Sequence, residues 1–148
     1  MSEADYPYTS GATGEENACG YKRKQGVTKV FTSGEAKWET ESIKSVIEYG
    51  PVSVAVNADN DIIRNYASGI VTVDDNCPTK LDHNMPAVQA MQAVGYGYEG
   101  EQGYYIVRNS WGTTWGDQGY IKIGMIDGVG VCGFNQAVWW NLVLKSFQ

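Results

Sequence analysis

One histidine and three cysteines are the residues of this sequence whose side chains are best suited to chemistry. His83 is the only histidine, and it stands in "KLDHNMPAVQAMQAVGYG" at residues 80–97. An imidazole with a pKa near 6.5 can hold or release a proton at modest pH, which suits a general acid or base. Without further context, a lone histidine is more often an ordinary surface residue. His83 therefore needs a recognisable setting before a role can be assigned.

The cysteines Cys19, Cys77 and Cys132 stand far apart in the chain. They form no CxxC pair and no Cys/His cluster with the spacing of a zinc site, so we expect no metal and no other cofactor. The remaining alternatives are free thiols, or one disulfide with one cysteine left over.

Two elements before the histidine can be predicted from apolar spacing. The stretch "TESIKSVIEYG" predicts a helix over residues 40–50, with Thr40 or Ser42 as the N-cap and Gly50-Pro51 as the stop. "PVSVAVNA" at residues 51–58 alternates as a strand does. A helix that leads directly into a strand is the centre of the predicted layout.

The other segments are rich in turns and short strands. We expect a short helix that ends at Gly69, a brief strand over residues 70–73, and later strands in "GYYIVRNS", "GYIKIGM" and "AVWWNLVL". Residues 1–40 carry turn sequences such as "TSGATGEEN" and predict loop with at most short strands. No linker divides the chain, and 148 residues suit one globular domain.

Charge and hydropathy exclude two classes of partner. The formal net charge of −6 argues against nucleic acid, which requires clustered Lys and Arg. The longest apolar runs fall well short of a membrane span, and "MSEADYPY" has neither the basic start nor the apolar stretch of a signal peptide. We expect a soluble chain with no nucleic-acid or membrane partner, or a piece of a longer protein.

Several motifs in a fixed order are too particular for generic turns. "YGPVSVAVNA", "SGI", "LDH", "VGYG", "YYIVRNSWG" and "VCGF" follow one another, and "RNSWGTTWGDQGYI" is the most specific. Together they resemble the C-terminal half of the papain-like cysteine peptidases, the family of papain and the lysosomal cathepsins. The resemblance implies an α+β, mostly β fold: a papain-like right-hand domain over 41–148, with an antiparallel β-barrel-like sheet and one or two short helices. Residues 1–40 resemble the loop-rich end of the left domain.

The resemblance implies roles for the polar and aromatic residues around His83. His83 matches the catalytic histidine, which pairs with a cysteine thiolate and later donates its proton to the leaving amine. Asn109 matches the asparagine that accepts a hydrogen bond from the imidazole and fixes its orientation. Trp111 and Trp115 match the indoles that cover this bond, and they also suit a role as ordinary core aromatics.

The resemblance also implies a substrate pocket and a disulfide. The pocket for the side chain two residues before the cut would be lined by Ala55, Leu81, Asn84 and Ala137, and would be apolar. Cys77 and Cys132 match a family disulfide, and Cys19 matches a cysteine whose partner lies upstream of this chain. A peptide or protein is the implied substrate.

The main departure from the family is the missing nucleophile. The "CGSCW"-type motif at the start of a helix is absent, and we expect no helix to follow any of the three cysteines. A histidine without a thiolate has nothing to activate, so the isolated chain is predicted to be inactive. We expect the C-terminal portion of a cysteine endopeptidase that needs an N-terminal half carrying the nucleophile, with self-association as a further expectation. The family implies a lysosomal, vacuolar or secreted location.

Two other interpretations remain. The chain could be a catalytically inactive papain-like pseudoenzyme, or a peptide-binding or inhibitory module. A carbohydrate-binding β domain would suit the acidic, aromatic-rich composition alone, but the ordered motifs disfavour it.

The second departure is a stutter after the histidine. "MPAV" at 85–88 is nearly repeated by "MQAV" at 91–94, so His83 stands twelve residues before Gly95, whereas the family histidine stands six before it. If the strand ran straight, Gln89 would occupy the catalytic place. Proline is expelled from central strands, so Pro86 favours a bulge over residues 86–91 that leaves His83 facing Asn109.

Overall fold

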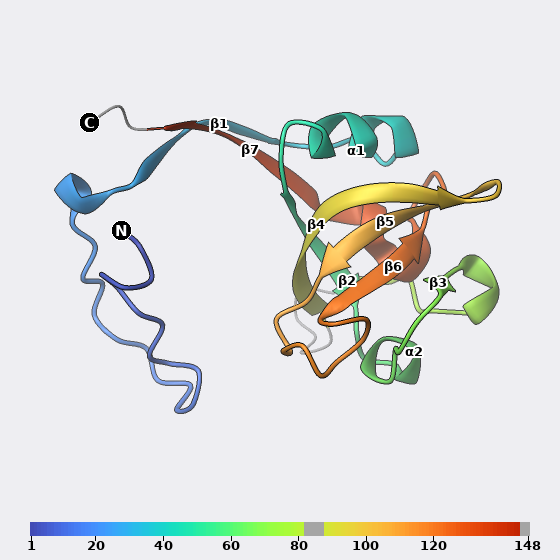
Figure 1. Ribbon diagram of the computed structural model, residues 1–148, viewed down its shortest axis with the longest axis horizontal. Helices are drawn as coiled ribbons and strands as arrows, with labels where there is room; N and C mark the ends of the chain where they lie inside the picture. Colours follow the sequence, from blue (N-terminus) through green and yellow to red (C-terminus); the bar gives the residue numbers. More distant parts are fainter. Residues whose placement is uncertain (82–87, 146–148) are drawn as a thin grey trace. The chain divides into compact units, whose positions relative to one another are not determined.

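The computed structural model describes residues 1–81 and 88–145 (Figure 1). Its residues form two compact units, Ser33–Asn141 and Met1–Thr32 with Leu142–Gln148. The helices, 3-10 helices (η) and strands are, in chain order, η1 (Arg23–Gln25), β1 (Thr28–Glu35), α1 (Thr40–Ile47), β2 (Val52–Asn57), α2 (Asp61–Arg64), β3 (Ile70–Val71), η2 (Val73–Asp75), β4 (Val88–Glu99), β5 (Gln102–Arg108), β6 (Tyr120–Gly124), η3 (Val131–Gln136) and β7 (Val138–Lys145).

The strands form one sheet in the order β1-β7-β2-β4-β5-β6-β3. β2 pairs with β4 and β7, and β5 pairs with β4 and β6, all antiparallel, whereas β3 pairs with β6 in parallel. The prediction of a mostly β, α+β fold with one or two short helices is confirmed. The described sheet is open, so it resembles a barrel only loosely.

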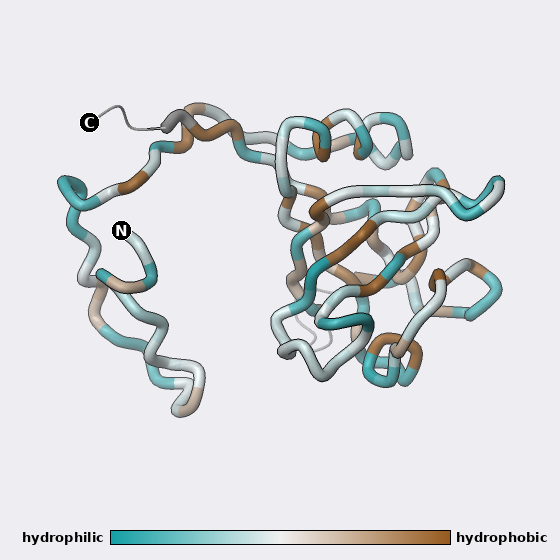
Figure 2. Tube along the Cα trace, in the orientation of Figure 1, coloured by the Kyte–Doolittle hydropathy of each residue, from teal (hydrophilic) through white to brown (hydrophobic). Residues whose placement is uncertain are grey.

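The core lies within the unit Ser33–Asn141, between the sheet, α1 and η3. Figure 2 shows that the hydrophobic residues follow the strands, whereas the tip of the β4–β5 hairpin is hydrophilic. Tyr105 of β5 stacks on Phe134 of η3 with ring centroids 4.6 Å apart, and both are fully buried. The predicted alternation in β2 is confirmed, because Val52, Val54 and Val56 are each at most 1% exposed.

The helix α1 is confirmed, but its predicted cap is wrong. The N-cap is Glu39, whose side chain makes no capping bond. The Thr40 N–H instead donates to the Asp127 carboxylate at 2.8 Å, which lowers the pKa of that carboxyl, and Ser42 accepts a bond from the Lys37 N–H. The cap comes from 87 residues away, so local sequence could not reveal it.

The N-terminal segment contains more strand than predicted. β1 has eight residues, although at most short strands were expected before residue 40. Seven of its residues are exposed, so it lacks the apolar alternation by which a strand is recognised. Its close contact is at Gly34, where an added Cβ would lie 2.7 Å from the Trp140 ring.

The helix and the strand that follow β2 are both shorter than predicted. α2 ends at Arg64 rather than near Gly69, and β3 ends at Val71. Asn60 caps α2 by accepting a bond from the Ile63 N–H at 3.0 Å.

Candidate active site

Asn109 lies immediately after β5 and is only 7% exposed. Its N–H donates to the Gly119 carbonyl at 2.9 Å, and its Oδ1 accepts a bond from the Ser110 N–H at 2.7 Å. Among the described residues, its buried Nδ2 has no hydrogen-bond partner. A buried donor of this kind costs free energy unless an acceptor reaches it. The side chain is thus fixed in place with one polar atom still unused.

The first residues of β4 test whether the repeated segment after the histidine bulges out of the strand. Only residues from 88 onward are described. Residues 88–93 pair one to one with β2, and Gln89 lies opposite Val56. The one irregularity in the described β4 pairings falls between Ala93 and Gly95. The expected bulge over residues 86–91 is therefore wrong for residues 88–91. His83, Asn84 and Pro86 lie outside the described residues, so their predicted placement is not tested.

Gln89 lies beside Ser110, the neighbour of Asn109. Its Nε2 donates to the Ser110 Oγ at 3.3 Å and to the Ala90 carbonyl at 2.9 Å. A depression of about 250 Å³ opens at this place, lined by Ala90, Met91, Gln92, Arg108, Asn109 and Ser110. Ser110 and Arg108 were not singled out from the sequence, although both flank Asn109. The site is a hollow at the ends of two adjacent strands.

The two predicted covering tryptophans contact each other. Trp111 and Trp115 lie edge to face with ring centroids 5.3 Å apart, and Trp111 is 39% exposed. Trp115 Nε1 donates to the carbonyls of Ile63 and Arg64 at 3.0 and 3.1 Å. These hydrogen bonds connect the loop after Asn109 to α2. The covering role of both rings stays a prediction.

Tyr66, which follows α2, contacts β6, the strand that comes after that loop. Its hydroxyl donates to the Gly69 carbonyl at 2.6 Å and accepts a bond from the Lys122 N–H at 3.3 Å. Burial raises the pKa of Tyr66. The rings of Tyr66 and Trp115 have centroids 5.9 Å apart, so the loop that contains Trp115 packs against the residues that follow α2.

Two of the four predicted pocket residues lie side by side. The Ala55 N–H donates to the Ala137 carbonyl at 3.1 Å, and both residues are buried. Leu81 lies near η3, where a Cβ added to Gly133 would be 3.0 Å from Leu81 Cδ2. Asn84 is outside the described residues. The structure thus places Ala55 next to Ala137, and Leu81 beside Gly133.

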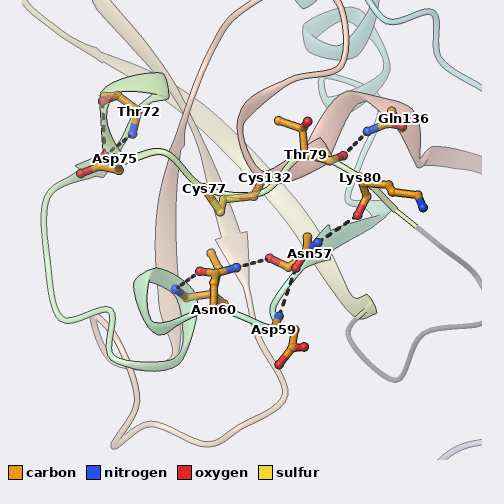
Figure 3. The surroundings of a disulfide bond; sticks show 11 residues. Asn57, Asp59, Asn60, Thr72, Asp75, Cys77, Thr79, Lys80, Cys132 and Gln136 are labelled. Carbon is orange, nitrogen blue, oxygen red and sulfur yellow. Dashed lines mark hydrogen bonds between the residues drawn. A yellow bond between two sulfur atoms is a disulfide. The ribbon is translucent and has the colours of Figure 1, made fainter.

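Residues 77–81, here called the anchored segment, lead directly to residue 82. The predicted disulfide Cys77–Cys132 is confirmed and ties the segment to η3 (Figure 3). Gln136 Nε2 donates to the Thr79 carbonyl, and the buried Asn57 Nδ2 donates to the Lys80 carbonyl at 2.9 Å. One covalent bond and two hydrogen bonds hold five residues.

The state of the three cysteines agrees with the prediction, but the place of Cys132 differs from it. Cys19 is free and exposed, as predicted. Cys132 lies within η3, although none of the cysteines was expected to precede a helix. η3 is a kinked 3-10 helix with left-handed backbone at Cys132 and Gly133, and the disulfide occupies the thiol.

Within the described ranges, no three His, Cys, Asp or Glu side chains gather as a metal site. None of the helices found there is long and apolar enough to cross a bilayer.

Comparisons with known proteins show the family of this chain and agree with its fold. Residues 1–142 match the model of the papain family of cysteine proteases. Cysteine proteinase COT44 of Brassica napus is 40% identical over 122 residues, which cover 82% of this chain and 34% of that protein. Papaya proteinase 4 of Carica papaya is 35% identical over 144 residues, covering 94% of this chain and 38% of that protein.

A solved structure shares the architecture. The crystal structure of the Carica candamarcensis cysteine protease CMS1MS2 in complex with E-64 superposes with a TM-score of 0.63 at 33% identity, covering 76% of this chain and 49% of that chain. The mostly β fold is therefore that of a papain-like protein. The chain belongs to the papain family of cysteine proteases, and it spans about a third of the length of the two relatives above.

Proposed function

We propose that this chain is the C-terminal portion of a papain-like cysteine endopeptidase and supplies its histidine and asparagine. The observation that carries the proposal is the placement of Asn109. This amide is buried, its Oδ1 is held by the Ser110 N–H, and it lines an open depression at the strand ends. An orienting group needs this fixed position next to accessible space.

In this proposal the imidazole of His83 is the general base and then the general acid. It takes the proton of a cysteine thiol and later gives it to the leaving amine. The second lone pair of the Asn109 Oδ1 accepts the hydrogen bond of the ring, while Trp111 limits the access of water. The thiol comes from an N-terminal half, because the Cys77 and Cys132 thiols are joined and Cys19 is in the exposed segment "ACGYK".

The substrate of the proposed enzyme is a peptide or protein. Ala55, Ala137 and Leu81, with Asn84, would receive the side chain two residues before the cut. Three of these side chains are aliphatic, so we expect a preference for an apolar residue at that position.

Reconstitution tests the proposal. The chain alone should not cleave a fluorogenic peptide amide, because a base without a thiolate forms no acyl-enzyme. Combined with the N-terminal half of a relative such as papaya proteinase 4, it should gain hydrolysis that a thiol alkylator abolishes. Asn109→Ala should lower kcat, and His83→Ala should remove it. Turnover by the chain alone would contradict the proposal.

A second candidate, an inactive papain-like binding module, is favoured by one observation. Gln89 pairs with Val56 in an unbroken register and its side chain contacts Ser110, the neighbour of Asn109, which supports the straight-strand alternative. Under this candidate the reconstituted complex binds a peptide aldehyde or peptide ligand without hydrolysing the matching substrate.

The location follows as a proposal from the family. Plant relatives of this chain include proteins of Brassica napus and Carica papaya, and we place the chain in a lysosomal or vacuolar compartment or outside the cell. An N-terminal half is its proposed partner, and self-association is the alternative use of the surface that faces it.

A further inference from the structure

We propose that a cavity on the outer face of β5 and β6 binds an ammonium group on an apolar stem, such as a lysine side chain carries. The cavity has a volume of about 370 Å³. Its walls are formed by β5, β6, the end of the loop between them and Tyr66. It shares no lining residue with the depression at Asn109, so the inference does not rest on the function proposed above.

One wall of the cavity is the face of β5 and β6 that points away from the core. Ile121 and Ile123 of β6 are fully buried, so the alternate residues Tyr120 and Lys122 lie on the other face, where both are half-buried. Ile106 of β5 lies directly opposite Lys122 on that face. An aromatic ring, an aliphatic side chain and the stem of a lysine give this wall an apolar surface.

The positive charge of Lys122 already has a partner. Its Nζ lies 2.6 Å from the Glu99 Oε1 and 4.8 Å from the centroid of the Tyr104 ring. The bond to Glu99 raises the pKa of Lys122. Tyr104 pairs with Gly124, two residues beyond Lys122, so the ammonium is directed away from the Tyr120 end of β6. Lys122 therefore contributes its stem to the cavity, and its charge is compensated elsewhere.

Asp117 places an unpaired negative charge at the cavity wall. It lies in a tight turn, in which its N–H donates to the Tyr120 carbonyl at 2.9 Å and its carbonyl accepts from the Tyr120 N–H at 3.0 Å. Within the part of the chain that the structure describes, the Asp117 carboxylate has no ion pair. The turn therefore holds a carboxylate beside the cavity without a cation of its own.

Tyr66 adds a second aromatic ring. Its hydroxyl is fixed between the Gly69 carbonyl and the Lys122 N–H, and the residue is only 8% exposed. Burial raises the pKa of Tyr66, and the negative charge of Asp117 adds to the rise, which shows that the carboxylate acts at this ring. Two tyrosine rings beside one carboxylate suit a cation, because aromatic faces and a negative charge both attract it.

The walls select a ligand by charge and by shape. An apolar wall with two tyrosine rings and one unpaired carboxylate favours a cation that carries a hydrophobic stem. The net charge of −6 attracts cations to the chain as a whole. An anion would meet the carboxylate of Asp117, while the ammonium of Lys122 is held by Glu99.

Titration of the full chain, followed by NMR of its amide signals, tests the site. The probe is Nα-acetyl-lysine N-methylamide, and Nα-acetyl-norleucine N-methylamide is an uncharged control of similar length. The lysine probe should shift the signals of residues 117–122 and bind about fivefold more tightly than the norleucine probe, as one partly exposed ion pair with an aromatic contribution allows. Equal affinities, or shifts confined to other residues, would overturn the inference.

Two variants separate the carboxylate from a general effect of charge. Asp117→Asn should weaken binding of the lysine probe about fivefold and leave the norleucine probe unchanged. Asp74→Asn is the matched control, because it removes the same charge at an exposed position that does not line the cavity. It should leave both affinities unchanged. If both variants weaken the lysine probe equally, the net charge attracts it and the inference fails.

A third probe identifies the source of the ammonium group. n-Butylammonium carries the same stem without the peptide groups. Tighter binding of the lysine probe assigns the site to a lysine side chain of a polypeptide, and equal binding assigns it to a free amine. Either result supports the site. Binding is measured on the chain alone, so the outcome is independent of whether a reconstituted enzyme hydrolyses peptides.

Discussion

The anchored segment and the first residues of β4 flank residues 82–87, and they are held in different ways. The anchored segment, residues 77–81, is tied by a disulfide and by two side chains that reach its carbonyls. The start of β4 is held by backbone pairing with β2. Bonds made by side chains require particular residues, whereas backbone hydrogen bonds between strands can form with almost any residue.

The two regions should therefore tolerate substitution differently. A substitution in the anchored segment or its partners should cost stability, because each tie depends on one side chain. A substitution at Gln89 should cost little stability, because the backbone pairing with β2 remains.

The disulfide should give the largest effect. Cys77 and Cys132 are 55 residues apart, and in the chain-entropy estimate a loop of this length contributes about 4 kcal/mol to the free energy of unfolding. Cys77→Ala with Cys132→Ala should lose most of this in urea unfolding. Cys19→Ala is the control and should change nothing, since Cys19 is free and exposed. Equal stability of both variants would remove the distinction drawn above.

Gly133→Ala should be next, at about 3 kcal/mol. Gly133 has φ of +79°, and an added Cβ would lie 2.5 Å from the Thr79 carbonyl oxygen of the anchored segment. Left-handed backbone and a clash with the main chain both contribute. Gly128→Ala isolates the first cost, because Gly128 has φ of +84° and open space around it. The two free energies of unfolding should differ by the clash alone, and equal losses would place the anchored segment elsewhere.

Asn57→Ala should cost about 1 to 2 kcal/mol. The variant removes the donor to the Lys80 carbonyl and the acceptor for the Asp59 N–H, and leaves both without that partner. Amide exchange near Lys80 should speed up while exchange in β5 stays slow. Asn141→Ala, at an exposed position on β7, should stay within about 0.5 kcal/mol.

Gln89→Ala should give the smallest effect on stability, under about 0.5 kcal/mol. Its side chain makes one long bond to Ser110 and one to its own neighbour, and the backbone pairing with Val56 is unchanged. Gln92→Ala provides the reference for an exposed residue on the same strand. A loss of about 2 kcal/mol at residue 89 alone would show that the start of β4 also depends on its side chains.

Much of the sheet could be predicted because its signals are local. Val52, Val54 and Val56 alternate, and the run from Tyr104 to Val107 is continuous and aromatic or β-branched, so β2 and β5 were recognisable. β1 has no such pattern, since its apolar Val30 and Phe31 are exposed, and it exists because β7 pairs beside it. Strands that depend on a neighbour cannot be recognised from their own residues.

The site was predicted in part for the same reason. Asn109 and the cysteine pair were found from motif resemblance, and the structure places Asn109 at a hollow and joins the pair. The pairing of residues 88–91 was wrongly predicted, because the prediction rested on the exclusion of Pro86 from central strands. The pairing of β4 with β2 and β5 is seen only in the structure. Asp127 as the helix cap was missed because it is remote in sequence.

The pairing of Gln89 with Val56 has a consequence for how such a chain can change by duplication. The repeat unit of the stutter is six residues, an even number, and a strand shifted by an even number presents every side chain to its former side. A duplication of this length therefore leaves the alternation of buried and exposed side chains in the strand unchanged. Selection for folding alone would therefore not remove such a duplication.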